Sequence, residues 1–390
     1  MKVAFYTDSF DPSRGGMERV THILSNHLKK LGVELYGICV YDLPVNKNLY
    51  SQYVSVIQAD GNGDNPCIDS IVEFIQQNKI DVFVNQVFVS FATLTMQRKI
   101  KDFTSAILIN AKHTTPLLLN SIDNFDRAMP LSQWLGKLFF RVYKRLVLKP
   151  KYINGERDSY IMADKTVLLA QSNIAEFLEY NHIADPNKLC VINNPIECDA
   201  SANYPCDTSE KKDVMLVVSR MSNTQKRIDR ALLFWKYFAQ KHPDWELKIV
   251  GDGKDLNMLK GIAHNLELER YSFEGASSNP YGYYREAKIF LMTSSFEGWG
   301  MTIVEAMTQG CVPIAMDSFS ALHDIITNGE NGEIVPENNY TAMCYAAEKI
   351  INNFDAYSTN AFNSTGRFSV DKIGNDWVNL FKTLLINKKL

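Results

Sequence analysis

One stretch near the middle of the second half of the sequence restricts the fold more than any other. The apolar run from Ala287 to Met292 is typical of a buried strand, and Cys311–Ala315 is a second such run. Between them, Thr302–Gln309 has helical character, and Gly310 follows as its stop signal. A strand, a helix and a strand in this order predict a parallel sheet, whose ligands bind beyond the carboxyl ends of the strands.

Two acids frame the turn of this unit. Glu297 precedes the glycines Gly298 and Gly300, and Glu305 lies eight positions later in the helix. The glycines allow the backbone to approach a bound group, and the helix start offers free N–H groups, so phosphate or sugar oxygens would suit this place. An equally open alternative is a capping box, in which Thr302 and Glu305 only fix the helix start.

The same alternation recurs along the whole chain. Lys2–Thr7 and Val33–Val40 are predicted strands around a helix at Met17–Leu31, and a second set of strands begins at Val214–Val218. Since 390 residues are too many for one ordinary core, the pattern predicts an α/β protein with two Rossmann-like, doubly wound parallel-sheet domains. A polar stretch that contains Pro205 separates them, so the domains are expected at 1–198 and 199–370, followed by a helix over 371–390.

Composition excludes several classes of protein. With 46% apolar and 22% charged residues the chain is globular, and a net charge of −3 disfavours a general nucleic-acid binder. The first residues form a short strand without a signal-peptide pattern, and no apolar run reaches about 18 residues, so a cytoplasmic protein without a membrane span is expected. Seven scattered cysteines without a Cys-x-x-Cys pair predict neither zinc nor disulfides.

Several residues follow predicted strands and are therefore candidate ligand contacts. Arg220 and Lys226 lie on a strand-to-helix loop and suit a diphosphate, although the adjacent Arg227 could replace Lys226 in that role. His113 follows the predicted strand Ser105–Asn110, where a hydrogen-bonded loop histidine is the alternative. Gly16 belongs to a glycine-rich turn that is not a dinucleotide fingerprint.

The string from Phe296 to Ile314, with its two acids, Ala-Met and Gly-Cys-Val-Pro-Ile, resembles the E-x7-E signature of the retaining GT-B glycosyltransferases of family 4. The glycine turn near Gly16, the Arg220 loop and Val250-Gly-Asp-Gly253 resemble further motifs of that family, so the resemblance covers most of the chain. It implies a GT-B fold whose two domains face each other across a cleft, with the last helix crossing back to the first domain.

The resemblance also implies roles for individual residues. Glu297 would contact the donor sugar and Glu305 the nucleotide ribose, while His113 would lie beside the sugar. Arg220 and Lys226 would bind the diphosphate, and these two cations would form the catalytic set together with Glu297 and His113. The remaining expected donor-binding residues are Gly16, Gly298, Trp299, Gly300, Met301 and Thr302.

The activity that the resemblance implies is transfer of a sugar from a nucleotide-diphosphate sugar, by analogy a UDP-sugar, to a saccharide or lipid-linked saccharide in polysaccharide biosynthesis. Because the sequence has no Asp-x-Asp, no metal is expected, nor any other cofactor. Two alternatives stay open: a GT-B sugar-nucleotide epimerase, and a non-catalytic protein that only binds the nucleotide-sugar.

The segment from Trp134 to Tyr152 is rich in basic and apolar residues and has no acid. It predicts a basic amphipathic helix that could hold the protein on an anionic membrane surface. A helix that packs its apolar face on the domain is the alternative. The basic residues are Lys137, Arg141, Lys144, Arg145, Lys149 and Lys151.

Overall fold

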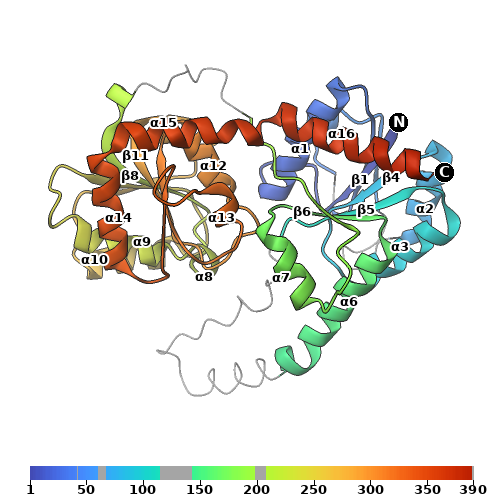
Figure 1. Ribbon diagram of the computed structural model, residues 1–390, viewed down its shortest axis with the longest axis horizontal. Helices are drawn as coiled ribbons and strands as arrows, with labels where there is room; N and C mark the ends of the chain where they lie inside the picture. The colour runs from blue at the N-terminus through green and yellow to red at the C-terminus, as the bar shows by residue number, and fades with distance from the viewer. Residues whose placement is uncertain (42, 60–66, 115–142, 198–207, 389–390) are drawn as a thin grey trace. The chain divides into compact units, whose positions relative to one another are not determined.

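A computed structural model describes residues 1–41, 43–59, 67–114, 143–197 and 208–388 (Figure 1). The chain divides into two compact units. The first consists of Met1–Pro195 together with Val370–Leu390, and the second of Ile196–Ser369. The sequence predicts domains over 1–198 and 199–370, with a last helix over 371–390.

The first unit is built on a parallel sheet that has seven strands among the described residues, in the order β3-β2-β1-β4-β5-β6-β7. The chain therefore winds outward from β1 in one direction and then, from β4, in the other. The strands are β1 (Lys2–Thr7), β2 (Glu34–Cys39), β3 (Ser55–Gln58), β4 (Val82–Asn85), β5 (Ile107–Ala111), β6 (Lys165–Leu168) and β7 (Leu189–Val191).

Helices cover both faces of this sheet because alternate strand residues point to opposite sides. On one face, the core joins Leu24 of α1 (Gly16–Lys30) with Trp377 and Phe381 of α16 (Val370–Asn387). On the other face lie α2 (Ile68–Asn78) and α3 (Phe91–Phe103). The remaining helices among the described residues are α6 (Lys149–Met162), α7 (Ser172–Tyr180), a 3-10 turn η1 (Lys47–Tyr50) and a π-helical turn η2 (Lys144–Leu148).

The second unit contains, in its described residues, a six-stranded parallel sheet with the order β10-β9-β8-β11-β12-β13. Here the winding reverses between β8 and β11, which are neighbours although two strands separate them in the sequence. The strands are β8 (Lys212–Val218), β9 (Glu246–Val250), β10 (Tyr271–Gly275), β11 (Ala287–Met292), β12 (Val312–Met316) and β13 (Glu333–Val335).

The core of the second unit also has two sides. Ile289 and Leu291 of β11 face a cluster that includes Trp235, whereas Phe290, which alternates with them, contacts Tyr284 on the opposite face. The helices of its described part are α8 (Asn223–Lys226), α9 (Ile228–Phe238), α10 (Leu256–Asn265), α11 (Tyr281–Glu286), α12 (Met301–Met307), α13 (Leu322–Ile325), α14 (Tyr340–Asn352), α15 (Phe354–Ser364) and the 3-10 turns η3 (Thr208–Glu210) and η4 (Thr365–Phe368).

Two doubly wound parallel sheets with helices on both faces agree with the fold class expected from the sequence.

Candidate functional site

The reversal of winding between β8 and β11 places two loops side by side at the carboxyl edge of the second sheet. In open α/β sheets, ligands bind in the crevice at such a reversal. The loop after β8 carries Arg220 and Lys226, and the loop after β11 carries Glu297. The sheet topology therefore places the segments that carry three of the predicted residues at one edge of the sheet.

The loop after β8 is supported by the glycine turn after β9. Gly251 and Gly253 have φ angles of +138° and +155°, which residues with a side chain rarely adopt. A Cβ at Gly251 would collide with the backbone carbonyl of Ser219, and one at Gly253 would lie 2.6 Å from the carbonyl oxygen of Met221. The two glycines are thus what allows the turn to pack directly beneath the Arg220 loop.

The short helix α8 is fastened to the loop after β11. The Ser295 backbone N–H donates to the Gln225 carbonyl at 2.7 Å, and the Thr293 hydroxyl donates to the Lys226 carbonyl at 3.3 Å. The Gln225 side-chain amide donates to the Phe296 carbonyl at 3.3 Å. One backbone–backbone bond and two bonds from side chains to backbone carbonyls thus fix the two loops to each other.

Within this frame, the side chains of Lys226 and Glu297 form an ion pair. Lys226 Nζ lies 2.5 Å from Glu297 Oε1, and the two side chains are 20% and 11% exposed. The Gln225 amide donates to the other carboxylate oxygen, Oε2, at 3.3 Å. A half-buried cation and a carboxylate held at both oxygens thus meet at the reversal of the sheet.

The two adjacent cations on this loop have different partners. Arg227 has a left-handed backbone (φ +46°) and donates from Nε and a terminal nitrogen to both oxygens of Asp229, each at 2.9 Å. These hydrogen bonds raise the pKa of Arg227. Lys226, by contrast, faces Glu297. The Arg220 side chain is exposed at the same edge.

The second acid, Glu305, lies deeper than the first. Its side chain in α12 is 1% exposed, and Oε2 accepts a hydrogen bond from the Tyr284 hydroxyl at 3.0 Å. Helix α12 follows Gly300 (φ +97°) and has no side-chain cap, so the structure does not form the alternative capping box of Thr302 and Glu305. Gly298 and the first-turn residues Met301 and Thr302 are half-buried.

The Trp299 indole is buried and packs edge-on against Phe368, with ring centroids 5.3 Å apart. In this arrangement the ring belongs to the core of the second unit, and only the Trp299 backbone remains for the donor-binding role expected from the sequence.

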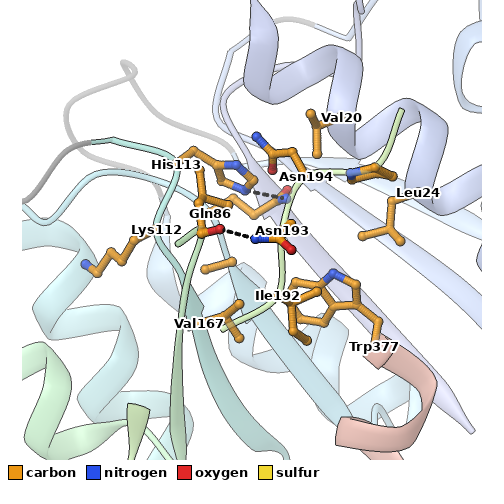
Figure 2. A pocket seen from close by; sticks show the side chains of 13 residues that line it. Val20, Leu24, Gln86, Lys112, His113, Val167, Ile192, Asn193, Asn194 and Trp377 are labelled. Atoms are coloured by element: carbon orange, nitrogen blue, oxygen red, sulfur yellow. Dashed lines mark hydrogen bonds between the residues drawn. The ribbon is translucent and has the colours of Figure 1, made fainter. Parts of the chain in front are cut away.

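In the first unit, the residues predicted from the sequence lie at the carboxyl edge of its own sheet. Gly16 is the exposed first residue of α1, with open space where a Cβ would lie. His113, two residues beyond β5, lines a small pocket and contacts Gln86 (Figure 2). The Gln86 amide nitrogen lies 3.2 Å from His113 Nε2, and the Thr21 hydroxyl donates to the Gln86 oxygen at 3.0 Å.

Burial sets the protonation of this histidine. It lowers the pKa of His113 to about 4, so the ring is neutral at neutral pH. A neutral imidazole can donate or accept a single hydrogen bond to a sugar hydroxyl but supplies no positive charge there.

Sequence reasoning missed three residues of these arrangements: Gln86, Gln225 and Tyr284. Gln86 directly follows β4, and Gln225 lies one residue before Lys226, so position at a strand end or beside a predicted ligand is a signal that could have found them. Tyr284 carries no such signal, because its contact with Glu305 depends on how α11 packs against α12.

Comparison with known proteins agrees with this arrangement. Residues 206–363 match the family model described as glycosyl transferases group 1. The crystal structure of Anabaena Alr3699/HepE in complex with UDP superposes with a TM-score of 0.75 at 16% identity, covering 98% of this chain and all of that chain. These similarities support a GT-B glycosyltransferase.

Proteins with similar sequences align with different fractions of this chain. An uncharacterized glycosyltransferase of Haemophilus influenzae is 25% identical over 387 residues, 96% of this chain and 98% of the relative. A lipopolysaccharide 1,6-galactosyltransferase of Salmonella typhimurium is 31% identical over 152 residues, 37% of this chain and 41% of that enzyme. Such relatives support sugar transfer in glycan biosynthesis as the general activity.

In the part of the chain that the structure describes, none of the helices combines the length and the apolar character needed to cross a bilayer.

Proposed function

We propose that this glycosyltransferase transfers a hexose from a UDP-sugar to a saccharide or lipid-linked saccharide acceptor in the synthesis of a cell-surface polysaccharide. The observation that carries the proposal is the meeting of Lys226 and Glu297 at the reversal of the second sheet. UDP is favoured because HepE, which has the same fold, was crystallised with UDP and with UDP-glucose. The acceptor class is favoured by lipopolysaccharide galactosyltransferases among the sequence relatives.

In this proposal the second unit holds the donor. Lys226 and Arg220 bind the diphosphate. Glu297 binds sugar hydroxyls, and Glu305 binds the ribose. The backbone of residues 298–302 lies against the donor. In the first unit, Gly16 allows close approach of the phosphates, and neutral His113 hydrogen-bonds the sugar.

The reaction breaks the bond between the anomeric carbon and the phosphate oxygen and forms a bond from that carbon to the acceptor oxygen. In the retaining mechanism that we propose, the acceptor attacks from the side of the leaving group, and its proton passes to the departing phosphate. The developing negative charge is stabilised by the prepositioned Lys226 and Arg220, without a metal ion.

The basic segment before and within α6 is proposed to place the enzyme on an anionic membrane surface. Lys137 and Arg141 lie outside the described residues. Of the described part, Arg145 and Lys151 are exposed cations, and the apolar Leu146 between them is 69% exposed. An exposed leucine beside cations suits a lipid surface better than the alternative of an apolar face packed on the domain.

The proposed catalytic role of the two cations is tested by substitution. Arg220→Ala and Lys226→Ala should each lower kcat by about a hundredfold or more, since each removes a donor aimed at developing charge. Arg227→Ala is the matched control, because Arg227 is bound to Asp229, and its effect should stay below about tenfold.

The assay uses UDP- and GDP-sugars with and without lipid-linked acceptors, in the presence and absence of EDTA. Acceptor-independent isomerisation of the donor would point to an epimerase, and binding without turnover to a non-catalytic protein. Near-normal kcat in both the Arg220 and Lys226 variants would refute the diphosphate assignment, and activity lost to EDTA and restored by Mg²⁺ would refute the metal-independent mechanism.

A further inference from the structure

The ion pair between Lys226 and Glu297 is not what holds its two loops together. The loops are already joined by the Ser295–Gln225 backbone bond and by the Thr293 hydroxyl on the Lys226 carbonyl. The Arg220 end of the loop is independently fixed by the glycine turn after β9. Lys226 can therefore exchange its partner while the backbone of the site stays in place.

The two roles proposed for this pair compete with each other. Lys226 is to bind the diphosphate and Glu297 the sugar hydroxyls, yet in the structure each is occupied by the other at 2.5 Å. A diphosphate that approaches Lys226 must take the cation from the carboxylate and lie near that negative charge. A diphosphate therefore competes with the Glu297 carboxylate for the Lys226 cation, so donor binding weakens the internal pair.

Gln225 keeps the Glu297 carboxylate in position after Lys226 has left it. Lys226 contacts Oε1, whereas Gln225 donates to Oε2 and is itself fixed by its bond to the Phe296 carbonyl. When Lys226 leaves, the Gln225 hydrogen bond remains. Glu297 then keeps its orientation with Oε1 free to accept from a hydroxyl group.

We propose that the Lys226–Glu297 ion pair is a resting contact that the donor's diphosphate displaces, and that Gln225 is the positioning residue that holds Glu297 afterwards. This inference rests on the proposed function. Its consequence is an order of events, because Glu297 becomes available to the sugar only when a diphosphate has taken Lys226. The site thereby couples recognition of the two halves of the donor.

The test is the affinity for UDP alone, measured by calorimetry on the full chain. Glu297→Gln keeps the size of the side chain and removes the competing charge, so UDP should bind about fivefold or more tighter than to the wild type. The rate of sugar transfer should nevertheless fall, because the Glu297 carboxylate is no longer there to bind the sugar hydroxyls. Unchanged or weaker UDP binding by Glu297→Gln would overturn the inference.

Asp229→Asn is the matched control, because it makes the same change in net charge and releases Arg227 on the same loop. UDP affinity should change by less than about twofold in this variant, since separated charges are screened. If both substitutions tighten UDP binding equally, the cause is the change in net charge and not the loss of the ion pair. If only Asp229→Asn tightens UDP binding, Arg227 is the diphosphate ligand. Either result would overturn the inference.

A second pair of variants tests the mechanism. Adding Lys226→Gln to Glu297→Gln should abolish the tightening. Gln225→Leu should lower kcat and leave UDP affinity unchanged, whereas a merely structural role would lower UDP affinity and the melting temperature together and would overturn the role of Gln225. If the wild type binds no UDP, both the proposed function and this inference are refuted. If the wild type binds UDP and Glu297→Gln binds it with the same affinity, only this inference is refuted.

Discussion

At the scale of single residues, the two acids of the site differ in their partners. Glu297 is paired with a cation at the sheet edge, whereas the deeper Glu305 accepts a hydrogen bond from a phenol. A carboxylate with a charged partner can exchange it for a ligand. A carboxylate fixed by Tyr284 is held in one orientation before any ligand arrives, which suits recognition of a fixed group such as a ribose.

The role of Glu305 can be separated from its structural contribution. Glu305→Gln should weaken UDP binding about tenfold or more if the carboxylate accepts from the ribose, since hydrogen bonds to charged groups contribute roughly 1.5–3 kcal/mol. Tyr284→Phe removes only the supporting hydroxyl, so it should lower the melting temperature and change UDP affinity by less than about threefold. Calorimetry and thermal melts of both variants give the answer. A Glu305→Gln protein with lower stability but normal UDP affinity would make Glu305 structural only.

At the scale of elements, α6 and the turn before it have two different halves. From Ile153 to Tyr160 the helix buries side chains against the first unit, and its Glu156 pairs with Lys112, next to His113. The π-helical turn η2 instead leaves Leu146 and Val147 on the surface. The inner half is thus part of the fold, and the outer half is the part that we propose contacts a membrane.

Binding to lipid vesicles tests the outer half of this element. The wild type should co-sediment with anionic vesicles at low salt, at about 1 kcal/mol per cation near the surface, and dissociate as salt rises. Arg145→Gln with Lys151→Gln should weaken this binding, and so should Leu146→Gln. The matched control is Lys30→Gln with Lys79→Gln, which removes two exposed cations elsewhere on the first unit. Equal binding by all variants would mean that the segment does not contact lipid.

Elements with a continuous apolar run could be predicted from the sequence, because both faces of a parallel strand are buried. Both β1 and β11 occur at the residues expected for them. The edge strand β3 (Ser55–Gln58) was missed, since its half-buried residues give no such run. The pairing of Lys226 with Glu297 was also beyond reach, because it depends on β8 lying next to β11 and not on any local pattern.

At the scale of the whole molecule, the two units differ in how the chain completes them. The second unit is one continuous segment, whereas the first is closed by α16, which comes after the second in the sequence. Ile373, Trp377 and Phe381 of α16 share a core with β1, and Gly374 leaves room for the His27 ring of α1. The first unit therefore lacks part of its core until the last residues of the chain are present.

This difference predicts how fragments behave. Residues 196–369 alone should unfold cooperatively and bind UDP within about tenfold of the full chain, because the fragment contains the whole sheet and the Lys226 loop. Residues 1–195 alone should not fold stably, since losing α16 exposes the surface that its large apolar side chains cover, at about 1.5–3 kcal/mol each against a total stability of about 5–15 kcal/mol. Joining residue 195 to residue 370 through a flexible linker should restore cooperative unfolding. Circular dichroism, recorded while the protein is heated, measures this unfolding. If 1–195 melts as cooperatively and at the same temperature as the linked form, α16 does not complete the core of the first unit.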